Sequence, residues 1–155
     1  MTVDDDHSGV VAPPPLVFLA CLGLGLGLHW RWPHALAPSG PWRVAGPALV
    51  VAGGVLAGLA IREFLRARTS PRPDRPTTAI VRAGPFRFSR NPAYLAMLLI
   101  LAGIALWMNS AAVLAMLVPL FVIIRLGVVA REERYLERKF GADYTDYKRS
   151  VRRWL

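Results

Sequence analysis

The sequence predicts an all-α protein, an integral membrane bundle of about four transmembrane helices with a C-terminal helical hairpin and a cytoplasmic amphipathic tail. Of its 155 residues, 54% are hydrophobic, and the mean hydropathy of +0.38 is high for a soluble domain. Apolar runs of near-membrane length alternate with short polar or basic segments. Residues 1–155 are expected to form a single domain, because this arrangement leaves no room for a separate soluble unit.

The N-terminal part predicts a tail followed by one span. Residues 1–12 begin with acidic and polar side chains and lack the basic region of a signal peptide, so we expect a mobile tail. Residues 16–28 form the first predicted transmembrane helix, which is short for a bilayer. Trp30 and Trp32 follow it and are typical of a membrane interface.

The second predicted span is residues 44–61, which lie between Arg43 and Arg62 and approach the roughly 20 residues that a bilayer requires. Residues 62–91 differ in composition, with eight arginines, four prolines and no lasting apolar period. We therefore expect a cytoplasmic loop there.

Glycines recur within the first two predicted spans. The run LGLGLGL at 22–28 resembles a phosphate-binding loop in glycine content, but no strand precedes it, so the required context is missing. The four-residue spacings of Gly23 with Gly27 and of Gly54 with Gly58 instead predict close packing of helices.

A helical hairpin is predicted next. Asn91 is placed to cap a helix, and Pro92 suits the first turn of that helix. Residues 93–107 and 111–130 are the third and fourth predicted spans, joined by the uncharged turn 108–110. Folding back in this way returns the end of the fourth span to the start of the third.

The distribution of basic residues predicts the orientation in the membrane. Eight of the 19 Lys and Arg residues lie in 62–91, eight lie in 131–155, and only Arg31 and Arg43 lie between the first two spans. Because cytoplasmic loops collect Lys and Arg, both basic segments are expected inside. We expect a bacterial-type inner membrane protein with both termini in the cytoplasm.

Residues 131–155 are amphipathic. Gly141 is expected to end one helix and begin another, and the segment is expected to lie along anionic membrane lipid, although a solvated charged tail is the alternative. The apolar face recurs at three- and four-residue steps and comprises Tyr135, Leu136, Phe140, Tyr144, Tyr147, Val151 and Trp154.

The predicted hairpin brings residues 91–94 close to Glu132 and Glu133. The region where they meet offers the positive N-terminal end of a helix, two carboxylates, and the rings of Phe86, Phe88 and Tyr94. It is therefore a candidate pocket, with one side toward water and the other toward lipid.

Two other classes of site are disfavoured. The net charge of +9 is accounted for by arginines that flank spans, so we expect no nucleic-acid partner. Cys21 lies alone in an apolar run, and His7, His29 and His34 are far in sequence from the arginine-rich stretch before Asn91, so we expect no metal.

The blocks TTAIVRAGPFRFSRNPAYL and REERYLERKFGADYTDYKRSVRRWL resemble the isoprenylcysteine carboxyl methyltransferase and phospholipid methyltransferase group of integral membrane enzymes. The resemblance covers roughly residues 70–155. It rests on a G-P-[FY]-x-x-x-R-[HN]-P-x-Y block, a hairpin, a Glu pair and F-G-x-x-Y-x-x-Y. It implies S-adenosylmethionine as the cofactor.

The same resemblance implies a set of cofactor-binding residues. Their alternatives are structural: Asn91 as a helix cap only, Tyr94 as an interface anchor, and the Glu pair as partners of Arg82, Arg87 or Arg90. The implied set is Thr78, Ala79, Ile80, Val81, Phe86, Asn91, Pro92, Ala93, Tyr94, Glu132 and Glu133.

Three departures from the family pattern bear on the substrate. Asn91 replaces a common His, and Phe86 replaces a common Tyr. Val128 stands where the prenylcysteine enzymes have an Arg suited to a carboxylate, and the nearest candidates for substrate binding are Arg125 and Arg131. Arg125 interrupts the fourth span and serves either as an anchor or in binding an anion.

The leading hypothesis is transfer of a methyl group from S-adenosylmethionine to a small lipophilic acceptor: a prenylcysteine-like carboxylate, a phospholipid amine or a thiol. No catalytic residue is assigned, because in-line methyl transfer needs no nucleophile from the protein. An amine acceptor would need a base, for which Glu133 and Tyr94 are the nearby candidates. The alternatives are a membrane reductase that uses NADPH and a non-enzymatic protein that binds anionic lipid.

Overall fold

The computed structural model describes residues 9–36, 40–70 and 77–155. Residues 1–8 of the predicted tail, and 71–76 of the predicted loop, lie outside them. The described residues are helical, with one isolated bridge between Ala35 and Ser110 and no strand. The elements are α1 Pro14–Arg31, α2 Trp42–Arg66, η2 Gly84–Arg87, α3 Pro92–Trp107, α4 Ala111–Ala115, α5 Leu117–Val122, η3 Ile123–Val129, α6 Ala130–Phe140 and α7 Ala142–Ser150.

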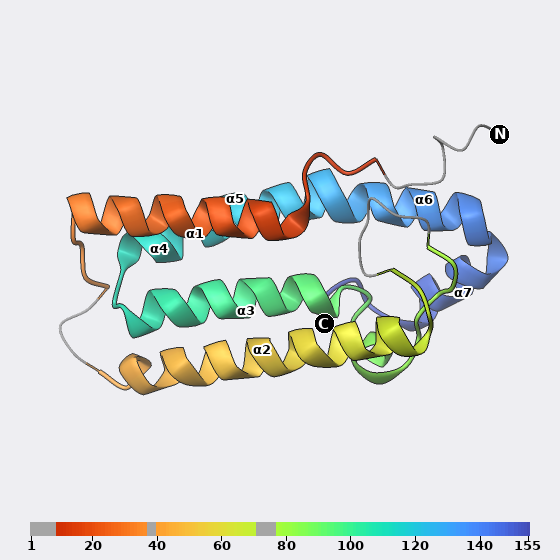
Figure 1. Ribbon diagram of the computed structural model, residues 1–155, viewed down its shortest axis with the longest axis horizontal. Coiled ribbons are helices and arrows are strands. Elements are labelled where there is room, and N and C mark those ends of the chain that lie inside the picture. Colours follow the sequence, from red (N-terminus) through yellow and green to blue (C-terminus); the bar gives the residue numbers. More distant parts are fainter. Residues whose placement is uncertain (1–8, 37–39, 71–76) are drawn as a thin grey trace.

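The helices α1, α2 and α3 and the run 111–140 are the long rods of the described residues, and they alternate in direction (Figure 1). The fourth rod is the continuous run 111–140, made of α4, α5, η3 and α6. The end of α2, the start of α3, α6 and α7 lie together at one end of the bundle, to the right in Figure 1. Two segments that are about forty residues apart in the chain therefore meet there, as the predicted hairpin requires.

Two of the rods are long and apolar enough to cross a membrane, namely Trp42–Arg66 and Ala111–Phe140. The helix α3 is apolar but has only 16 residues, which is shorter than the roughly 20 of a perpendicular span. Large apolar side chains face outward on these rods, such as Val51 at 65% exposure and Val118 at 67%. A surface of this kind suits lipid better than water.

The helix α2 extends past the predicted span 44–61 and includes the first residues of the predicted loop. Glu63 explains the extension, because it is buried and its Oε1 atom lies 3.1 Å from both Arg62 Nη2 and Arg66 Nη1. Ala60 is fully buried in a small apolar cluster with Phe86. The additional helical turn thus carries side chains that hold the following loop.

The helices α2 and α3 approach closely at glycines, but not at the predicted ones. A Cβ atom at Gly53 would lie 2.9 Å from the carbonyl oxygen of Ala96. A Cβ atom added at any of the four glycines that we predicted to pack would meet no described atom of another element within 4 Å, so the prediction of packing within the chain at Gly23, Gly27, Gly54 and Gly58 is wrong. The four-residue spacing does place each pair of glycines on one face of a helix, but those faces point out of the bundle.

The helix α1 packs on the fourth rod rather than on α2. Val17 and Cys21 share the main apolar core with Leu101, Val113 and Leu120. The fourth rod changes from α-helix to π-helix at Ile123–Val129, and the backbone N–H of Val11 donates to the carbonyl of Gly127 in that segment at 3.2 Å. The segment before α1 is thereby attached to the same rod.

The predicted break at Gly141 is confirmed, since α6 ends at Phe140 and Gly141 has a φ of +55°. The apolar face of residues 131–155 differs from prediction. Tyr135, Tyr144 and Tyr147 are buried against the protein, and Trp154 packs on Phe121 with ring centroids 5.4 Å apart. The tail covers the end of the bundle with the face that we expected to lie on lipid.

Candidate functional site

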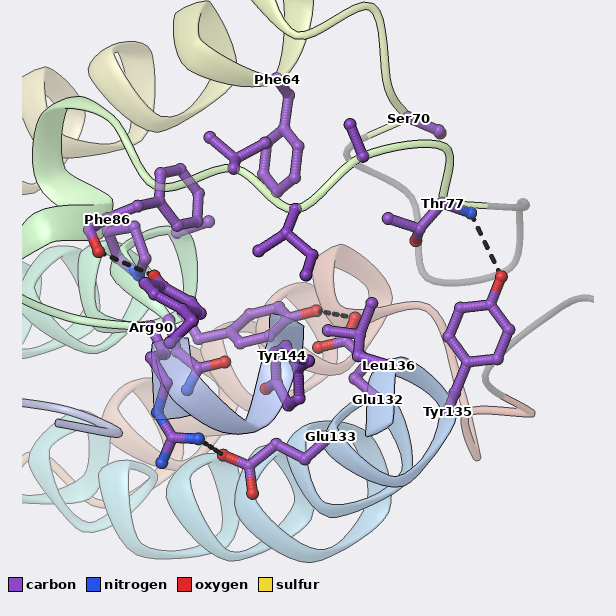
Figure 2. Close-up of a pocket in the computed structure, with 18 residues that line it drawn as sticks. Phe64, Ser70, Thr77, Phe86, Arg90, Glu132, Glu133, Tyr135, Leu136 and Tyr144 are labelled. Atoms are coloured by element: carbon purple, nitrogen blue, oxygen red, sulfur yellow. Dashed lines mark hydrogen bonds and ion pairs between the residues drawn. The ribbon is translucent and has the colours of Figure 1, made fainter. Parts of the chain in front are cut away.

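A cavity lies where the loop after α2, the start of α3 and the helices α6 and α7 meet (Figure 2). Its empty space, counted together with the open mouth, is about 860 Å³. It is lined by Phe64, Ser70, Thr77, Ala79, Ile80, Val81, Phe86, Arg90, Asn91, Pro92, Ala93, Tyr94, Glu132, Glu133, Tyr135, Leu136, Tyr144 and Tyr147.

The structure brings most of the predicted cofactor-binding residues to this cavity. Ten of them line it, and Thr78 does not. The backbone N–H of Thr78 donates to Thr69 Oγ1 at 3.0 Å, and its hydroxyl donates to the carbonyl of Arg68 at 3.3 Å. Thr78 therefore fastens the loop to the end of α2, while the next three residues reach the cavity.

The two sequence blocks are joined by a direct hydrogen bond. The hydroxyl of Tyr94 on α3 donates to Oε1 of Glu132 on α6 at 2.7 Å. The predicted proximity of residues 91–94 to the Glu pair is thus confirmed. Tyr94 is an inner residue of the bundle at 9% exposure rather than an anchor at the lipid surface.

Glu132 lies beyond the apolar part of the fourth rod, which ends at Ala130. Burial raises the pKa of Glu132 to about 7, and the negative charge of Glu133 adds to this effect, while the hydrogen bond from Tyr94 opposes it. Its carboxylate borders the cavity and accepts the hydrogen bond from Tyr94. A carboxylate placed in this way is suited to a ligand that brings hydroxyl groups or a positive charge.

Glu133 points the other way and is held by two arginines. Its Oε1 atom lies 3.1 Å from Arg90 Nη1, and Arg153 binds both oxygens, with Nη2 2.6 Å from Oε2 and Nε 3.0 Å from Oε1. Glu133 and Arg90 are almost fully buried. The structural alternative of pairing with Arg90 thus applies to Glu133, and removing one partner of such a buried pair costs about 3–5 kcal/mol.

Asn91 occupies the N-cap position of α3 as predicted, but its side chain makes no capping hydrogen bond. It donates through Nδ2 to the carbonyl of Arg153 at 2.9 Å instead. The backbone N–H of Asn91 donates to Ser89 Oγ at 3.2 Å. The side chain of Asn91 therefore joins the start of α3 to the tail.

The loop before α3 is held by aromatic contacts. Phe86 packs edge-on against Phe64 with ring centroids 5.1 Å apart, and its carbonyl accepts a 2.7 Å hydrogen bond from the hydroxyl of Tyr147. Burial raises the pKa of Tyr147 to about 12, so this hydroxyl stays a donor at neutral pH. Phe88, which we expected in the pocket, is 75% exposed and does not line it.

Eight lining residues were not predicted as site residues: Phe64, Ser70, Thr77, Arg90, Tyr135, Leu136, Tyr144 and Tyr147. The block F-G-x-x-Y-x-x-Y contained a signal for two of them, because Tyr144 and Tyr147 share one face of α7. Burial is the main cause that raises the pKa of Tyr144. Phe64 gave no signal, since it lay in a segment predicted to be loop.

Arg125 and Arg131 do not line the cavity. The guanidinium of Arg125 lies over the ring of Phe121, 5.9 Å from its centroid. Arg131 donates through Nη1 to the carbonyl of Gly9 at 2.7 Å. The structure thus places one on the outer surface of the rod and the other against the segment before α1.

Comparisons with known proteins agree with the sequence blocks. An uncharacterized protein of Haemophilus influenzae is 51% identical over 63 residues, which are 40% of this chain and 98% of that relative. No solved structure matches the chain. The family model described as phospholipid methyltransferase matches residues 42–143, which include α2, α3, the whole fourth rod and most of the cavity lining. The chain belongs to the phospholipid methyltransferase family.

Proposed function

We propose that the protein transfers a methyl group from S-adenosylmethionine to a small lipophilic acceptor at the cytoplasmic face of a membrane. The observation that carries the proposal is the contact of Tyr94 with Glu132 in a cavity shared by the two sequence blocks. Membership in the phospholipid methyltransferase family supports the reaction type.

The lining residues fit the chemical groups of this donor. The donor has a sulfonium, an amino group and ribose hydroxyls, and the carboxylate of Glu132 can accept from hydroxyl or ammonium groups. The rings of Phe86 and Tyr144 offer faces for a cation or for a purine. Arg90 contributes a buried Nε atom that has no hydrogen-bond partner among the described residues. The chemistry of the site therefore suits a ligand with both cationic and anionic groups.

When bound, S-adenosylmethionine supplies an electrophilic methyl group on a sulfonium that loses its positive charge on transfer. The residues of the chain have to hold the donor, align an acceptor and exclude water. Ala79, Ile80 and Val81 would line the donor with backbone groups, and Glu132 would fix a polar group. The apolar rings of Phe64 and Phe86 would keep water from the reacting atoms.

An amine acceptor would have to lose a proton, whereas a carboxylate or thiolate would be ionised already. Glu133 is held by Arg90 and Arg153, so it is poorly placed to accept that proton. The hydroxyl of Tyr94 is protonated and donates to Glu132, so the amine proton would end on the Glu132 carboxylate, either directly or through Tyr94 as it passes its own proton on. The proposal therefore favours acceptors that need no base and assigns the Tyr94–Glu132 pair to the amine case.

We further propose that all four rods cross the bilayer, the fourth through its apolar part 111–130, with both termini in the cytoplasm. Basic residues gather at the end of the bundle that holds the cavity, which supports this orientation. The acceptor would then enter from lipid and the donor from water. Arg125 and Arg131 would contact the anionic part of the acceptor or of neighbouring lipid on its approach.

Calorimetry with detergent-purified protein tests the proposed function. We expect S-adenosylhomocysteine to bind with a Kd of about 1–100 μM, which corresponds to roughly 5–8 kcal/mol, and NADPH not to bind. Methyl-labelled donor added to membranes that contain the protein should then label a lipid fraction. Binding of NADPH instead of the nucleoside thioether would support the reductase, and binding of neither would overturn the proposal.

A further inference from the structure

The segment 151–155 connects two elements that line the cavity, the start of α3 and the helix α6. The carbonyl of Arg152 accepts from the backbone N–H of Arg90 at 3.0 Å. The carbonyl of Arg153 accepts from Asn91 Nδ2 at 2.9 Å and from the hydroxyl of Ser89 at 3.4 Å. Two successive carbonyls of this segment therefore hold the corner at which α3 begins.

The side chain of the same residue holds the other wall. Arg153 binds Glu133 of α6 through two contacts, at 2.6 and 3.0 Å, and this pairing raises the pKa of Arg153. Parallel contacts between a guanidinium and a carboxylate fix orientation as well as distance. Glu132, the neighbour of Glu133, carries the contact to Tyr94. The orientation of α6 at Glu133 thus determines where Glu132 faces.

The segment is itself anchored. Trp154 packs on Phe121 of α5 and against the main apolar core. Glu133 and Arg90 line the cavity, whereas Arg153 does not. Any influence of Arg153 on a ligand in the cavity must therefore pass through the residues that it holds.

We propose that Arg153 is a positioning residue for the donor site: its side chain fixes Glu133 on α6 and its carbonyl fixes Asn91 at the start of α3. It holds the two walls at the separation at which Tyr94 meets Glu132. The inference rests on the proposed function, because the donor is the ligand whose affinity reports on that separation.

The test compares two variants that each remove one positive charge at adjacent positions. Arg153→Gln removes the contacts with Glu133 and keeps the carbonyl, and we expect it to weaken S-adenosylhomocysteine binding by about tenfold. Arg152→Gln removes an exposed side chain that makes no polar contact with the described residues, and should change the affinity by less than about twofold. Equal affinities in the two variants would overturn the inference.

A double-mutant cycle separates positioning from general destabilisation. If Arg153 acts through Glu133, the double variant Glu133→Gln/Arg153→Gln should bind S-adenosylhomocysteine no more weakly than Glu133→Gln alone. If the two residues act independently, their fold losses in affinity should multiply. Multiplying losses would contradict the role assigned to Arg153. Should Arg153→Gln fail to fold, Arg153→Lys keeps one cation near Glu133 and should lose about threefold in affinity.

Coupling between two sites is reciprocal, so the donor should also stabilise the tail. Saturating S-adenosylhomocysteine should slow tryptic cleavage after residue 153, measured by intact mass. Arg153→Lys retains a tryptic site, and its cleavage should be faster and less protected by the ligand. If the wild type binds but protects the tail no better than Arg153→Lys does, only this inference is wrong. If the wild type does not bind the ligand, the proposed function fails as well.

Discussion

The hydroxyl of Tyr94 lies 2.7 Å from Oε1 of Glu132, although 38 positions separate the two residues in the chain. The contact joins the first turn of α3 to the first turn of α6 across the cavity. Because the fourth rod is one continuous helical run, its length and rotation determine whether Glu132 reaches Tyr94 at the cavity end of the bundle.

Glu132→Gln should weaken binding of S-adenosylhomocysteine by about tenfold or more at pH 8, because a charge-assisted hydrogen bond is replaced by a neutral one. The measurement is calorimetric titration of the purified protein. Asp146→Asn, which neutralises an exposed carboxylate on α7 outside the cavity lining, is the control and should bind normally. Unchanged affinity in Glu132→Gln would remove Glu132 from the site.

The same substitution should change stability in a pH-dependent way. Folding raises the pKa of Glu132 from 4.5 to about 7, so the stability that its protonated form contributes is present below pH 4.5 and is lost as pH rises through 7. The empty Glu132→Gln protein should therefore gain about 2 kcal/mol over the wild type between pH 5 and pH 8, or about 5 °C in Tm. A Tm difference that is constant over this range would contradict the raised pKa.

The contact between α2 and α3 predicts opposite outcomes at two neighbouring glycines. Gly53→Ala places a Cβ against the backbone of Ala96 and should destabilise the protein by about 1–3 kcal/mol. Gly54→Ala meets no described atom and should be neutral or slightly stabilising. Thermal unfolding in detergent distinguishes them, and similar losses at both positions would place the helix interface elsewhere.

Two phenylalanines of the loop form a second matched pair. Phe86 is buried against Phe64, and Phe86→Ala should lower the free energy of unfolding by about 3–5 kcal/mol. The variant should also lose donor binding. Phe88 is 75% exposed, and Phe88→Ala should change the stability of the purified protein by less than about 0.5 kcal/mol. A large loss of donor affinity in Phe88→Ala would show that its ring turns into the cavity when the ligand binds.

Sequence patterns were sufficient for the order of the long helices and for the meeting of the two blocks. The turn at 108–110 and the helix start at Pro92 follow from local chemistry, and a hairpin then has to bring Tyr94 near Glu132. The pairing of Arg153 with Glu133 could not be predicted in this way. It depends on the direction that the chain takes after Gly141, and several arginines of the tail were equivalent in the sequence.

The glycine faces of the helices and the amphipathic tail show a second feature that the sequence could not predict, namely which neighbour covers a given face. A spacing of four identifies one face of a helix, but the neighbour determines which face is inward, and here Gly53 rather than Gly54 or Gly58 meets α3. An amphipathic pattern likewise says that one face is covered without saying by what. In the structure Tyr147 of that face donates to the carbonyl of Phe86, so protein covers it.

The π-helical segment Ile123–Val129 has a consequence for how this chain tolerates changes in length. A π-turn holds one more residue than an α-turn, so deletion of the exposed Leu126 can be absorbed by tightening to α-helix, without rotating α6. A deletion just after Ala130 falls in regular α-helix, which has no extra residue to lose, so it turns the rest of α6 by about 100°. The Glu132 carboxylate would then face away from Tyr94, and relatives that differ by one residue in this rod are expected to differ within 123–129.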